Sequence, residues 1–434
     1  MNSDSYVDFF RQTSPYIHKH RGKTFVIALD GNTVAHANFH RTIHDIALLQ
    51  SLGIRIVLVH GARPQIDQRI TQAGEQSQFH NQLRITDSSA MQSVKEALGI
   101  TRWQIEAELS TGLPNSPMHG AQIKAIGGNF ITAKPMGILN GVDYQHTGEV
   151  RGIDADSIQQ QLQMGGLVLL SPIGFSPTGE AFNLSYQEVA AQTAIAINAE
   201  KLILVTEVSG ILEDNNLLRS LSVPEARALQ TKSDNTAQNK LLETACCACS
   251  EDVNRVHLVS CAEDGALLTE LFTRDGSGTL VMQDHSEVIR PAEIDDVGGI
   301  LDLIAPLEQQ QILVKRSREL LETEIARFTL ALHPEGDLLG CAALYPTSDS
   351  SQGEIACMAT NPEFLNQGIA TRLLQRLEAD ALKAKMTQIF VLTTQTAHWF
   401  LEKGFVEVEL SDLPEQKQSL YNYQRNSRIF RKSL

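Results

Sequence analysis

The sequence has no apolar run long enough to cross a membrane. In its 434 residues, stretches such as 54–59 and 167–170 are far shorter than the roughly 20 residues that a membrane-spanning helix needs. The first residues, MNSDSYVDFFRQ, also lack the basic start and apolar core of a signal peptide. We therefore expect a globular cytoplasmic protein with no membrane partner.

Positive charge is also scarce. The 36 Lys and Arg residues are outnumbered by 51 Asp and Glu residues, which gives a formal net charge of −15. This excess of negative charge opposes binding to nucleic-acid phosphates, so no nucleic-acid partner is expected. The basic residues that do cluster lie near the C-terminal end, where they could serve a local anionic site. They are Arg425, Arg428, Arg431 and Lys432.

Cysteine is sparse, and its spacing does not predict a metal site. The chain has six cysteines, three of which stand in the helical-looking CCAC. Cys246 and Cys249 have C-x-x-C spacing, but no second pair follows at the distance of a zinc ribbon. Small thiols packed on one face of a helix are favoured over metal or redox work. No metal is therefore expected, and a reducing compartment suits these thiols.

The first two-thirds of the sequence alternates apolar strands with helices. Predicted strands cover 25–29, 55–60, 167–171, 202–206 and 255–260, and predicted helices cover 39–51, 65–72 and 188–199. Continuous apolar strands between helices predict a largely parallel sheet covered on both faces. The length predicts two to three domains, and the Gly-, Ser- and charge-rich segment 273–287 is the best boundary between them.

The last third has a different order of elements, which begins at VIRPA (288–292). The predicted elements are helices over 295–306 and 316–324, strands near 329–332 and 339–344, a strand, loop and helix within 356–374, a strand over 389–393, and a helix over 397–403. The strand, loop and helix read ACMATNPEFLNQGIATRLL. Glycine at a helix opening lets main-chain N–H groups approach anionic oxygens. No Lys follows the glycine, so the anion is not expected to be a triphosphate.

This segment resembles the acyl-CoA pyrophosphate loop of the GCN5-related N-acetyltransferases, R/Q-x-x-G-x-G/A. Gly368 and Ala370 fit that pattern, whereas Leu365 stands where Arg or Gln is expected. The resemblance implies a smaller α+β acetyltransferase domain that uses acetyl-CoA. It also implies that the pantetheine arm runs along one strand and that the pyrophosphate meets main-chain amides at the helix opening. The implied residues are Cys357, Met358 and Ala359 for the arm, and Gln367, Gly368, Ile369, Ala370 and Thr371 for the pyrophosphate.

The first part of the chain resembles the amino-acid kinase family, specifically the acetylglutamate kinases. Four ordered motifs carry this resemblance: VLVHGARPQID (57–67), LRITD (83–87), SPIGFSPTGEAFNLSYQEVA (171–190) and EKLILVTEVSGIL (200–212). The family begins with K-x-G-G, but this chain has Ala28-Leu29-Asp30-Gly31, and Gln187 replaces a motif Asp. Lys240 keeps the last basic position but cannot replace the others. We therefore predict a kinase fold without phosphoryl transfer and without bound ATP.

A regulatory role is implied by a second pattern in the same part. His257, Glu270 and Gly276 keep the spacing that binds L-arginine in arginine-sensitive relatives, and a carboxylate suits a guanidinium. An ordinary strand His, a helix-face Glu and a loop Gly are the alternative. The helical segment 4–19 resembles the helix that interlaces subunits in those relatives, which implies a homo-oligomer, a hexamer by resemblance. A helix that packs on its own domain is the alternative there.

Taken whole, the chain resembles the bacterial N-acetylglutamate synthases, through LTTQTAHWFLEKGF (392–405) and LYNYQRNS (420–427). The resemblance implies an α/β protein: an oligomerisation helix (1–21), an amino-acid-kinase-like doubly wound domain (22–284) and an N-acetyltransferase domain (287–434). It implies acetyl transfer from acetyl-CoA to the α-amino group of L-glutamate, the first step of arginine biosynthesis, with feedback inhibition by L-arginine.

The acetyltransferase reaction needs a base, an oxyanion donor and an acid. Glu354 is the expected general base, although a carboxylate near pKa 4.3 is weak unless burial raises it, so a water relay is plausible. A strand-end surface Glu is the alternative. The N–H of Cys357 or Met358 is the expected oxyanion donor. Phe400 stands where many acetyltransferases place a Tyr acid, so the resemblance points to Ser427, with Tyr421 in reserve.

Glutamate carries two carboxylates, so two cations should converge on it. The resemblance points to Arg316 and Arg425 first, and to Lys417 as a third. A solvated helix face with Glu319 and Glu322 is the alternative for Arg316 and Arg318. Three other functions stay open: a kinase with an appended acetyltransferase, an arginine-binding regulatory protein with an inactive acetyltransferase domain, and an acetyltransferase for another amine.

Overall fold

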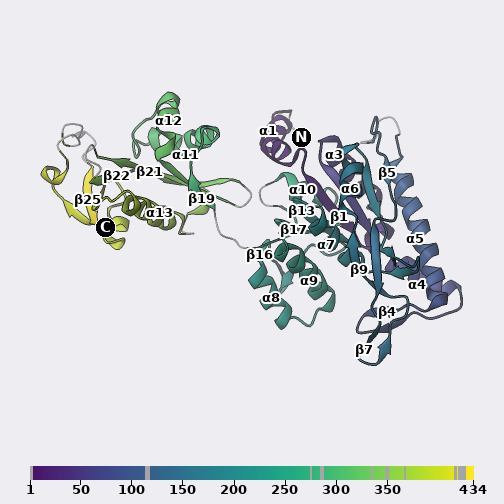
Figure 1. Cartoon of the computed structure of the whole chain (residues 1–434). Coiled ribbons are helices and arrows are strands. Elements are labelled where there is room, and N and C mark those ends of the chain that lie inside the picture. The colour runs from purple at the N-terminus through teal and green to yellow at the C-terminus, as the bar shows by residue number, and fades with distance from the viewer. Residues whose placement is uncertain are drawn as a thin grey trace. The chain divides into compact units, whose positions relative to one another are not determined.

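The computed structural model describes residues 3–112, 118–273, 276–283, 288–333, 336–347, 351–365, 368–414, 418 and 427–434 (Figure 1). The chain divides into two compact units, Met1–Asp284 and His285–Leu434, and each is described by itself. Within the described ranges, no helix combines the length and the apolar character needed to cross a bilayer.

The first unit is built on an eight-stranded sheet in the order β16-β18-β17-β13-β1-β2-β10-β5. Its strands are β1 (Thr24–Leu29), β2 (Arg55–His60), β5 (Ala125–Ile126), β10 (Leu167–Leu170), β13 (Lys201–Thr206), β16 (Ser220–Ser222), β17 (Arg255–Ser260) and β18 (Thr279–Met282). All neighbouring strands from β5 to β17 are parallel, and β18 pairs antiparallel with β17. The largely parallel sheet expected from the sequence is thus confirmed.

Helices cover both faces of this sheet because its strands are apolar on both sides. In β1, Phe25 and Ile27 pack in one cluster with α3 and α10, whereas Val26 and Ala28 pack in another with α6, α7, α8 and α9. These helices are α3 (Phe39–Ser51), α6 (Ala155–Gln163), α7 (Tyr186–Ala196), α8 (Val223–Lys232), α9 (Thr236–Ser250) and α10 (Ala266–Phe272). Figure 1 shows them around the central strands.

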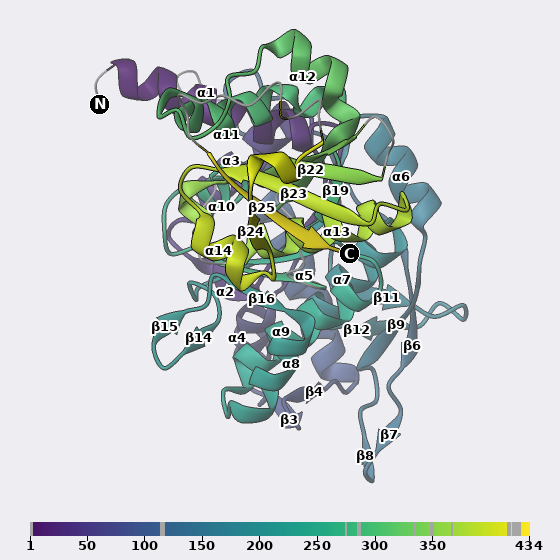
Figure 2. The ribbon, with the colours of Figure 1, turned by 90° about the vertical axis from the view of Figure 1, so that its left-hand side faces the viewer.

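Smaller elements complete the first unit. They are α1 (Ser3–His20), α2 (Gly31–Ala35), α4 (Arg63–Gln72), α5 (Ser88–Leu109), a four-stranded sheet of β6 (Ile131–Pro135), β9 (Gly148–Ile153), β11 (Ile173–Phe175) and β12 (Ala181–Asn183), and the hairpins β3–β4 (Gln78–His80, Leu83–Ile85), β7–β8 (Ile138–Leu139, Val142–Asp143) and β14–β15 (Leu212–Glu213, Asn216–Leu217). The β7–β8 hairpin extends away from the rest of this unit in both views (Figures 1 and 2).

The second unit is a seven-stranded sheet in the order β19-β20-β21-β22-β23-β25-β24. Its strands are β19 (Val288–Pro291), β20 (Phe328–Leu332), β21 (Leu338–Pro346), β22 (Gln352–Thr360), β23 (Gln388–Thr393), β24 (Val406–Val408) and β25 (Arg428–Ser433). Every neighbouring pair is antiparallel except β22 and β23. This parallel pair lies at the middle of the sheet.

Two pairs of helices cover the two faces of this sheet. One apolar cluster joins the sheet to α11 and α12, and another joins it to α13 and α14. Figure 2 shows α11 and α12 on one side of the strands and α14 on the other. The helices are α11 (Val297–Gln309), α12 (Arg318–Glu324), α13 (Ile369–Lys383) and α14 (Ala397–Glu402), with 3-10 turns η1 (Ile294–Asp296), η2 (Ile325–Arg327), η3 (Pro362–Phe364) and η4 (Leu410–Asp412).

Three expectations from the sequence need correction. The two units divide between Asp284 and His285, within the expected segment 273–287, but this segment also contains the buried strand β18, because Leu280, Val281 and Met282 fill the sheet beside β17. The helix expected over 316–324 begins at Arg318, since the Ser317 side chain caps it by accepting from the N–H of Leu320 at 3.2 Å. In the CCAC helix, Cys246 and Cys249 are buried as expected, but Cys247 is exposed.

Candidate active site

The centre of the second unit is an irregularity in β22. Ala356 pairs with Ala343 and Ala359 pairs with Cys341, so two residues of β22, Cys357 and Met358, oppose a single residue of β21. This is a β-bulge, and Cys357 adopts a positive φ of 52° there. The extra residue reverses the alternation of side chains along the strand.

The bulge changes which side chains face which helices. Ile355 packs in the cluster with α13, whereas Cys357 and Ala359 pack in the cluster with α11. Without the extra residue, all three would point to the same face, because side chains alternate strictly along a regular strand. At the middle of β22, the bulge therefore directs Ile355 toward α13, and Cys357 and Ala359 toward α11.

The parallel pair separates at the same place. The register of β22 with β23 runs over four residue pairs and ends at Ile355 and Val391, whereas β23 continues to pair with β25 up to Thr393. Beyond Ile355, the register of β22 is with β21 alone. The predicted pantetheine residues Cys357, Met358 and Ala359 follow directly after this separation. No pairing with β23 is recorded for their main-chain groups on that side.

The helix expected to receive the pyrophosphate begins close to its predicted position. Gly368 is the N-cap of α13 with a φ of 78°, which is why glycine suits this position. Ile369 is buried, and Ala370 and Thr371 are half-buried. Gln367 lies outside the described residues. Leu365, which stands where the family has Arg or Gln, is 57% exposed.

A cation that the sequence did not single out lies over this helix opening. A Cβ added at Gly368 would stand 2.9 Å from Nη1 of Arg372. Helical side chains lean toward the N-terminus, so a residue four positions along covers the preceding turn. The only available signal was therefore the helical spacing between Gly368 and Arg372.

Glu354 lies on β22 before the bulge, between two strands. It pairs with Tyr345 on β21 and with Phe390 on β23, so the three side chains project from the same face of the sheet. Glu354 is half-buried. It stands one residue before the end of the parallel register, which is the neighbourhood expected of the general base.

Arg316 lies in the loop before α12 and turns toward this face. Its N–H donates to Oε1 of Glu308 at 2.9 Å, and its guanidinium donates to the carbonyl of Val314 at 3.1 Å. Burial alone would lower the pKa of Arg316, but the nearby Cys357, Tyr345 and Glu324 raise it. The helix-face alternative is therefore wrong for Arg316.

Arg318 is the residue that fits the helix-face alternative. It is exposed, and its Nε donates to Oε1 of Glu322 at 2.9 Å, one turn along α12. Such an i,i+4 pair on a solvated face contributes little to stability.

Tyr345 and Glu324 complete the cluster around Arg316, and sequence reasoning missed both. The Tyr345 hydroxyl donates to Oε2 of Glu324 at 2.7 Å. Burial and the Glu324 carboxylate raise the pKa of Tyr345 to about 12. A tyrosine followed by proline and threonine at the end of a strand carries no local signal, so only the register with Glu354 reveals it.

The remaining residues predicted to act in catalysis or substrate binding lie only partly within the described part of the chain. Ser427 is half-buried and directly precedes β25, whose first residue pairs with Thr393 at the carboxyl end of β23. Phe400 is 3% exposed and packs edge-to-face on Trp399 and Phe405, in the apolar core. Arg425, Lys417 and Tyr421 lie outside the described residues.

Two of the C-terminal basic residues, Arg428 and Lys432, are each paired with a carboxylate of their own unit. Arg428 is engaged with Glu407, to which its Nε donates at 2.6 Å, and Lys432 donates to Oε1 of Glu378 at 2.6 Å. The expectation of a shared site is wrong for these two, because local carboxylates already neutralise them.

In the first unit, the end of β1 is occupied by structural contacts. Ala28 is fully buried, and Asp30 caps α2 by accepting from the N–H of Thr33 at 2.6 Å. Burial raises the pKa of Asp30 despite this hydrogen bond. A Cβ at Gly31 would lie 2.5 Å from Cδ of Pro64, so the chain is closely packed there. Lys240 is exposed and pairs with Glu243 at 2.9 Å.

The residues predicted to bind L-arginine do lie together. A buried lysine that the sequence did not indicate lies beside them. Nδ1 of His257 lies 2.7 Å from Oε1 of Glu270, and Nε2 lies 2.9 Å from Nζ of Lys201. Oε2 of Glu270 accepts from the N–H groups of Ser277 and Gly278 at 2.7 and 2.8 Å. Burial would raise the pKa of Glu270, but His257 and these two amides hold it below its usual value.

Gly276 closes this cluster. Its φ is 61°, and a Cβ there would lie 2.5 Å from Oε2 of Glu270. Both oxygens of Glu270 already accept hydrogen bonds, so a guanidinium would have to replace or share these donors.

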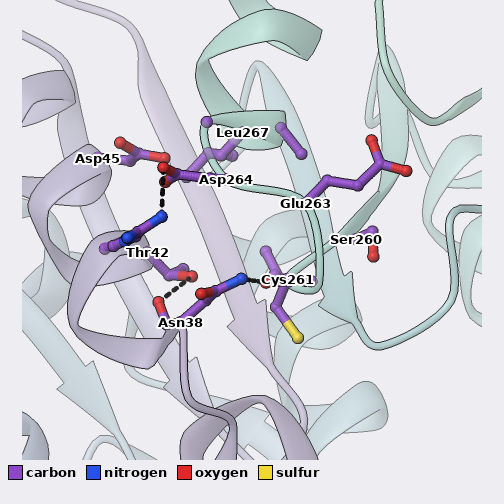
Figure 3. Close-up of a pocket in the computed structure, with 12 residues that line it drawn as sticks. Asn38, Thr42, Asp45, Ser260, Cys261, Glu263, Asp264 and Leu267 are labelled. Atoms are coloured by element: carbon purple, nitrogen blue, oxygen red, sulfur yellow. Dashed lines mark hydrogen bonds and ion pairs between the residues drawn. The ribbon is translucent and has the colours of Figure 1, made fainter.

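Two pockets among the described residues of the first unit lie elsewhere. One of about 10 Å³, room for about one water molecule, is lined by Asn38, Asp45 and Asp264 among others (Figure 3). Another of about 290 Å³ lies at the amino end of β1 beside Lys23 and Glu200. Neither is lined by a predicted site residue. Among the described residues, no group of three or more His, Cys, Asp or Glu side chains could hold a metal ion.

Two family profiles match the chain in the expected order. The amino acid kinase family matches residues 23–260, and the acetyltransferase (GNAT) family matches residues 300–405. Both resemblances inferred from the sequence are therefore confirmed, including the α/β class with a kinase-like part followed by an acetyltransferase part.

Full-length relatives carry both parts in one chain. The amino-acid acetyltransferase of Pseudomonas syringae pv. syringae is 50% identical over 430 residues, which cover 99% of each chain. A crystal structure of N-acetylglutamate synthase from Neisseria gonorrhoeae with coenzyme A and L-arginine is 35% identical over 99% of each chain, with a TM-score of 0.85. A structure of the synthase from that organism with coenzyme A and N-acetylglutamate is 36% identical over the same share, with a TM-score of 0.63.

The carboxyl pair in the small pocket gives a pH-dependent prediction. Burial raises the pKa of Asp45 from its ordinary 3.8 to about 7, and the Asp264 carboxylate acts in the same direction (Figure 3). The folded state thus holds a proton that the unfolded state loses between about pH 4 and 7, so stability falls as the pH rises through this window. We compare the free energy of unfolding of Asp45→Asn with that of the wild type. From pH 5 to pH 8 this difference should shift in favour of the variant by about 1–2 kcal/mol, allowing for partial exposure.

Denaturant unfolding at the two pH values measures this difference. Asp302→Asn, at an exposed position on α11, is the control and should show no such growth. An equal advantage of Asp45→Asn at pH 5 and pH 8 would contradict the assignment.

Proposed function

Because the chain belongs to the amino-acid acetyltransferase family, whose solved members include N-acetylglutamate synthase, we propose that it transfers acetyl from acetyl-CoA to the α-amino group of L-glutamate. The products are N-acetyl-L-glutamate and CoA. One observation carries the proposal: Glu354 and the Arg316 cluster share a face of β22, beside the point where β22 leaves β23.

The reaction divides among groups of this chain. The α-ammonium of glutamate loses a proton to Glu354, directly or through a water molecule. The nitrogen attacks the thioester carbonyl, and the oxyanion that develops accepts from the N–H of Cys357 or Met358. The C–N bond forms, the C–S bond breaks, and the CoA thiolate leaves. Ser427 orients or relays the proton that this thiolate takes.

Acetyl-CoA binding is assigned to β22 and the opening of α13. The pantetheine arm would run along Cys357, Met358 and Ala359, and the diphosphate would meet the amides of Gly368 to Thr371. Amides at a helix opening suit anionic oxygens. Arg316 would pair with one carboxylate of glutamate, and Arg425 or Lys417 with the other.

The first unit is proposed to be a regulatory domain that binds L-arginine as an inhibitor. His257, Glu270 and Gly276 would form the site, and Lys201 belongs to the same buried network. Since both Glu270 oxygens accept hydrogen bonds here, arginine binding would rearrange the loop that carries Ser277 and Gly278. Inhibition then requires only that arginine bind the less active state more tightly.

Assembly and location stay predictions. The last turn of α1 packs on its own unit, where Nε2 of His20 lies 3.0 Å from the carbonyl of Leu271. The rest of α1 is proposed to interlace subunits of a homo-oligomer, a hexamer by resemblance, and the cytoplasm is the proposed compartment. Light scattering of the full chain tests the oligomeric state.

The direct test is release of the CoA thiol from acetyl-CoA in the presence of L-glutamate. Glutamate should support release, and aspartate or glutamine should support much less, because the site is proposed to hold a five-carbon dicarboxylate. No release with any of these amino acids would overturn the proposal and favour an arginine-binding regulatory protein. Release with a different amine would favour the other acetyltransferase alternative.

Glu354→Gln tests the base. We expect kcat to fall roughly 100- to 10,000-fold, the usual contribution of a positioned base, with an unchanged affinity for CoA. Quenched reactions at saturating concentrations of both substrates measure kcat, and calorimetry measures CoA binding. The control is Glu322→Gln, a half-buried carboxylate of α12 that pairs with Arg318. A variant with more than a tenth of the wild-type kcat would remove Glu354 from the mechanism.

Arg316→Ala tests the substrate cation. Loss of a charge-assisted hydrogen bond costs about 1.5–3 kcal/mol, so kcat/KM for glutamate should fall roughly ten- to a hundredfold. The KM for acetyl-CoA should not change. Arg318→Ala, two residues along the chain, is a matched control with an exposed side chain. Equal losses in both variants would mean that Arg316 acts only on stability.

His257→Asn tests the regulatory site. Removal of the imidazole breaks the link between Lys201 and Glu270, so the arginine concentration for half-inhibition should rise at least about tenfold, the effect of one lost charge-assisted contact. Activity without arginine should remain. Inhibition curves with and without the substitution measure the shift, and unchanged curves would place arginine elsewhere.

A further inference from the structure

Two arginines follow one another by one turn on α13, beside the opening where the diphosphate of acetyl-CoA is proposed to bind. They are Arg372 and Arg376, and both are half-buried. Residues four apart lie on the same side of a helix, so both side chains project from the side of α13 that carries Gly368. Ile369 and Leu373 pack in the apolar core. The two arginines therefore lie beside the apolar stripe of the helix and not in it.

The two side chains extend in opposite directions along α13. Nε of Arg376 donates to Oδ2 of Asp380 at 2.8 Å, one turn toward the C-terminal end. Nη1 of Arg372 instead stands 2.9 Å from the place that a Cβ at Gly368 would occupy, one turn toward the N-terminal end. The charge of Arg372 therefore lies at the helix opening, whereas Asp380 holds the charge of Arg376 away from it.

The glycine at the opening leaves the space that this guanidinium uses. Any other residue at position 368 would bring its Cβ too close to Nη1 of Arg372, and the φ of 78° would strain it. The first N–H groups of α13 have no partner within the helix, and Gly368 has no side chain that could cap them. The first turn, Ile369-Ala370-Thr371-Arg372, also carries no carboxylate. The opening is therefore built from amides and one guanidinium.

This arrangement suits an anion with several oxygens. A helix dipole favours an anion at the N-terminus and repels a cation, so the guanidinium and the dipole oppose each other when they are alone. A diphosphate against the first-turn amides would interact favourably with both. The guanidinium of Arg372 could also hold two phosphate oxygens at once, because its N–H donors form a planar fork.

Position 365 cannot supply such a donor in this chain. The acyl-CoA loop pattern has Arg or Gln there, but Leu365 has no polar group, and it is 57% exposed. Leu365 precedes α13, whereas Arg372 belongs to it. A donor from Arg372 would thus reach the diphosphate from the helix and not from the preceding loop.

We propose that Arg372 binds the diphosphate of acetyl-CoA and replaces the side-chain donor that the acetyltransferase pattern has at position 365. The proposal rests on the proposed function, because it takes the opening of α13 as the diphosphate site. The pantetheine arm separates the diphosphate from the thioester carbon. Arg372 therefore contributes equally to binding of the substrate and of the transition state, which lowers the KM for acetyl-CoA and leaves kcat unchanged.

Arg372→Ala tests this role in the full-length protein. Loss of a charge-assisted contact should raise the KM for acetyl-CoA roughly ten- to a hundredfold, with kcat and the KM for glutamate unchanged. The Kd for CoA, measured by calorimetry, should rise by a similar factor. Arg376→Ala is the matched control on the same side of α13. It should change neither value, because Asp380 holds that side chain away from the opening.

Leu365→Arg separates a shared phosphate site from a general effect of charge. In the Arg372→Ala background, this second substitution should recover most of the lost affinity for acetyl-CoA, because it restores a donor at the position that the pattern uses. The same substitution in the wild type should have a much smaller effect, since Arg372 already fills the role. No recovery in the double variant would overturn the claim that the two positions serve one phosphate site.

Acetyl-dephospho-CoA, which lacks the 3′-phosphate, identifies the phosphate that Arg372 contacts. Arg372→Ala should lose the same factor in KM with this substrate as with acetyl-CoA. A loss that disappears would move Arg372 to the 3′-phosphate and overturn the assignment to the diphosphate. An unchanged KM for acetyl-CoA, or a fall in kcat alone, would also overturn the proposal.

Two further readouts keep the test decisive. Melting curves detect a variant that fails to fold, in which case Arg372→Met provides the readout, because it keeps the length of the side chain without its donors. Wild-type protein without glutamate-dependent release of the CoA thiol would overturn the proposed function itself. An active wild type with an unaffected Arg372→Ala would overturn only this inference.

Discussion

The acetyltransferase unit depends on one extra residue in its central strand. Because Cys357 and Met358 together oppose one residue of β21, the strand exchanges its faces at the point where it leaves β23. Glu354 stands just before this exchange, and the amides expected at the thioester stand just after it. A regular strand would keep the same hydrogen-bonded neighbours along its length, and its side chains would alternate strictly between the two faces of the sheet. The bulge thus lies beside the residues proposed as base, oxyanion donors and substrate cation.

In both units a carboxylate accepts from neighbouring donors, and in the first unit the charged groups are buried. In the first unit, Lys201 and Glu270 are joined through His257, and two main-chain amides complete the carboxylate. In the second, the Tyr345 hydroxyl donates to Glu324. Such networks hold their members in place, since a buried polar group that loses its partner is costly. They are therefore suited to sites that must respond to a ligand.

The first unit keeps the amino acid kinase fold although the end of its first strand differs from the family pattern. Its parallel sheet and both layers of helices are complete, although Ala28 and Asp30 stand where kinases of this fold have other residues. Ala28 packs in the core, and Asp30 caps a helix. Since the core depends on apolar contacts along β1, replacement of its terminal polar residues leaves the architecture unchanged.

The sequence by itself determined the class of both units, their order and most of their strands and helices, because buried parallel strands and amphipathic helices have strong local patterns. Helix 39–51 and strands 55–60 and 255–260 were predicted to the residue. The place of Gly368 at a helix opening also followed from the motif, and the place of Glu354 on a central strand followed from the strand pattern. The short strand β18 was missed because glycine and charge surround its apolar residues. Only the tertiary structure decided the bulge at Cys357, the buried Lys201 beside His257, and the cluster of Arg316, Tyr345 and Glu324. These features depend on register and on contacts between residues far apart in the chain, and no local spacing encodes them.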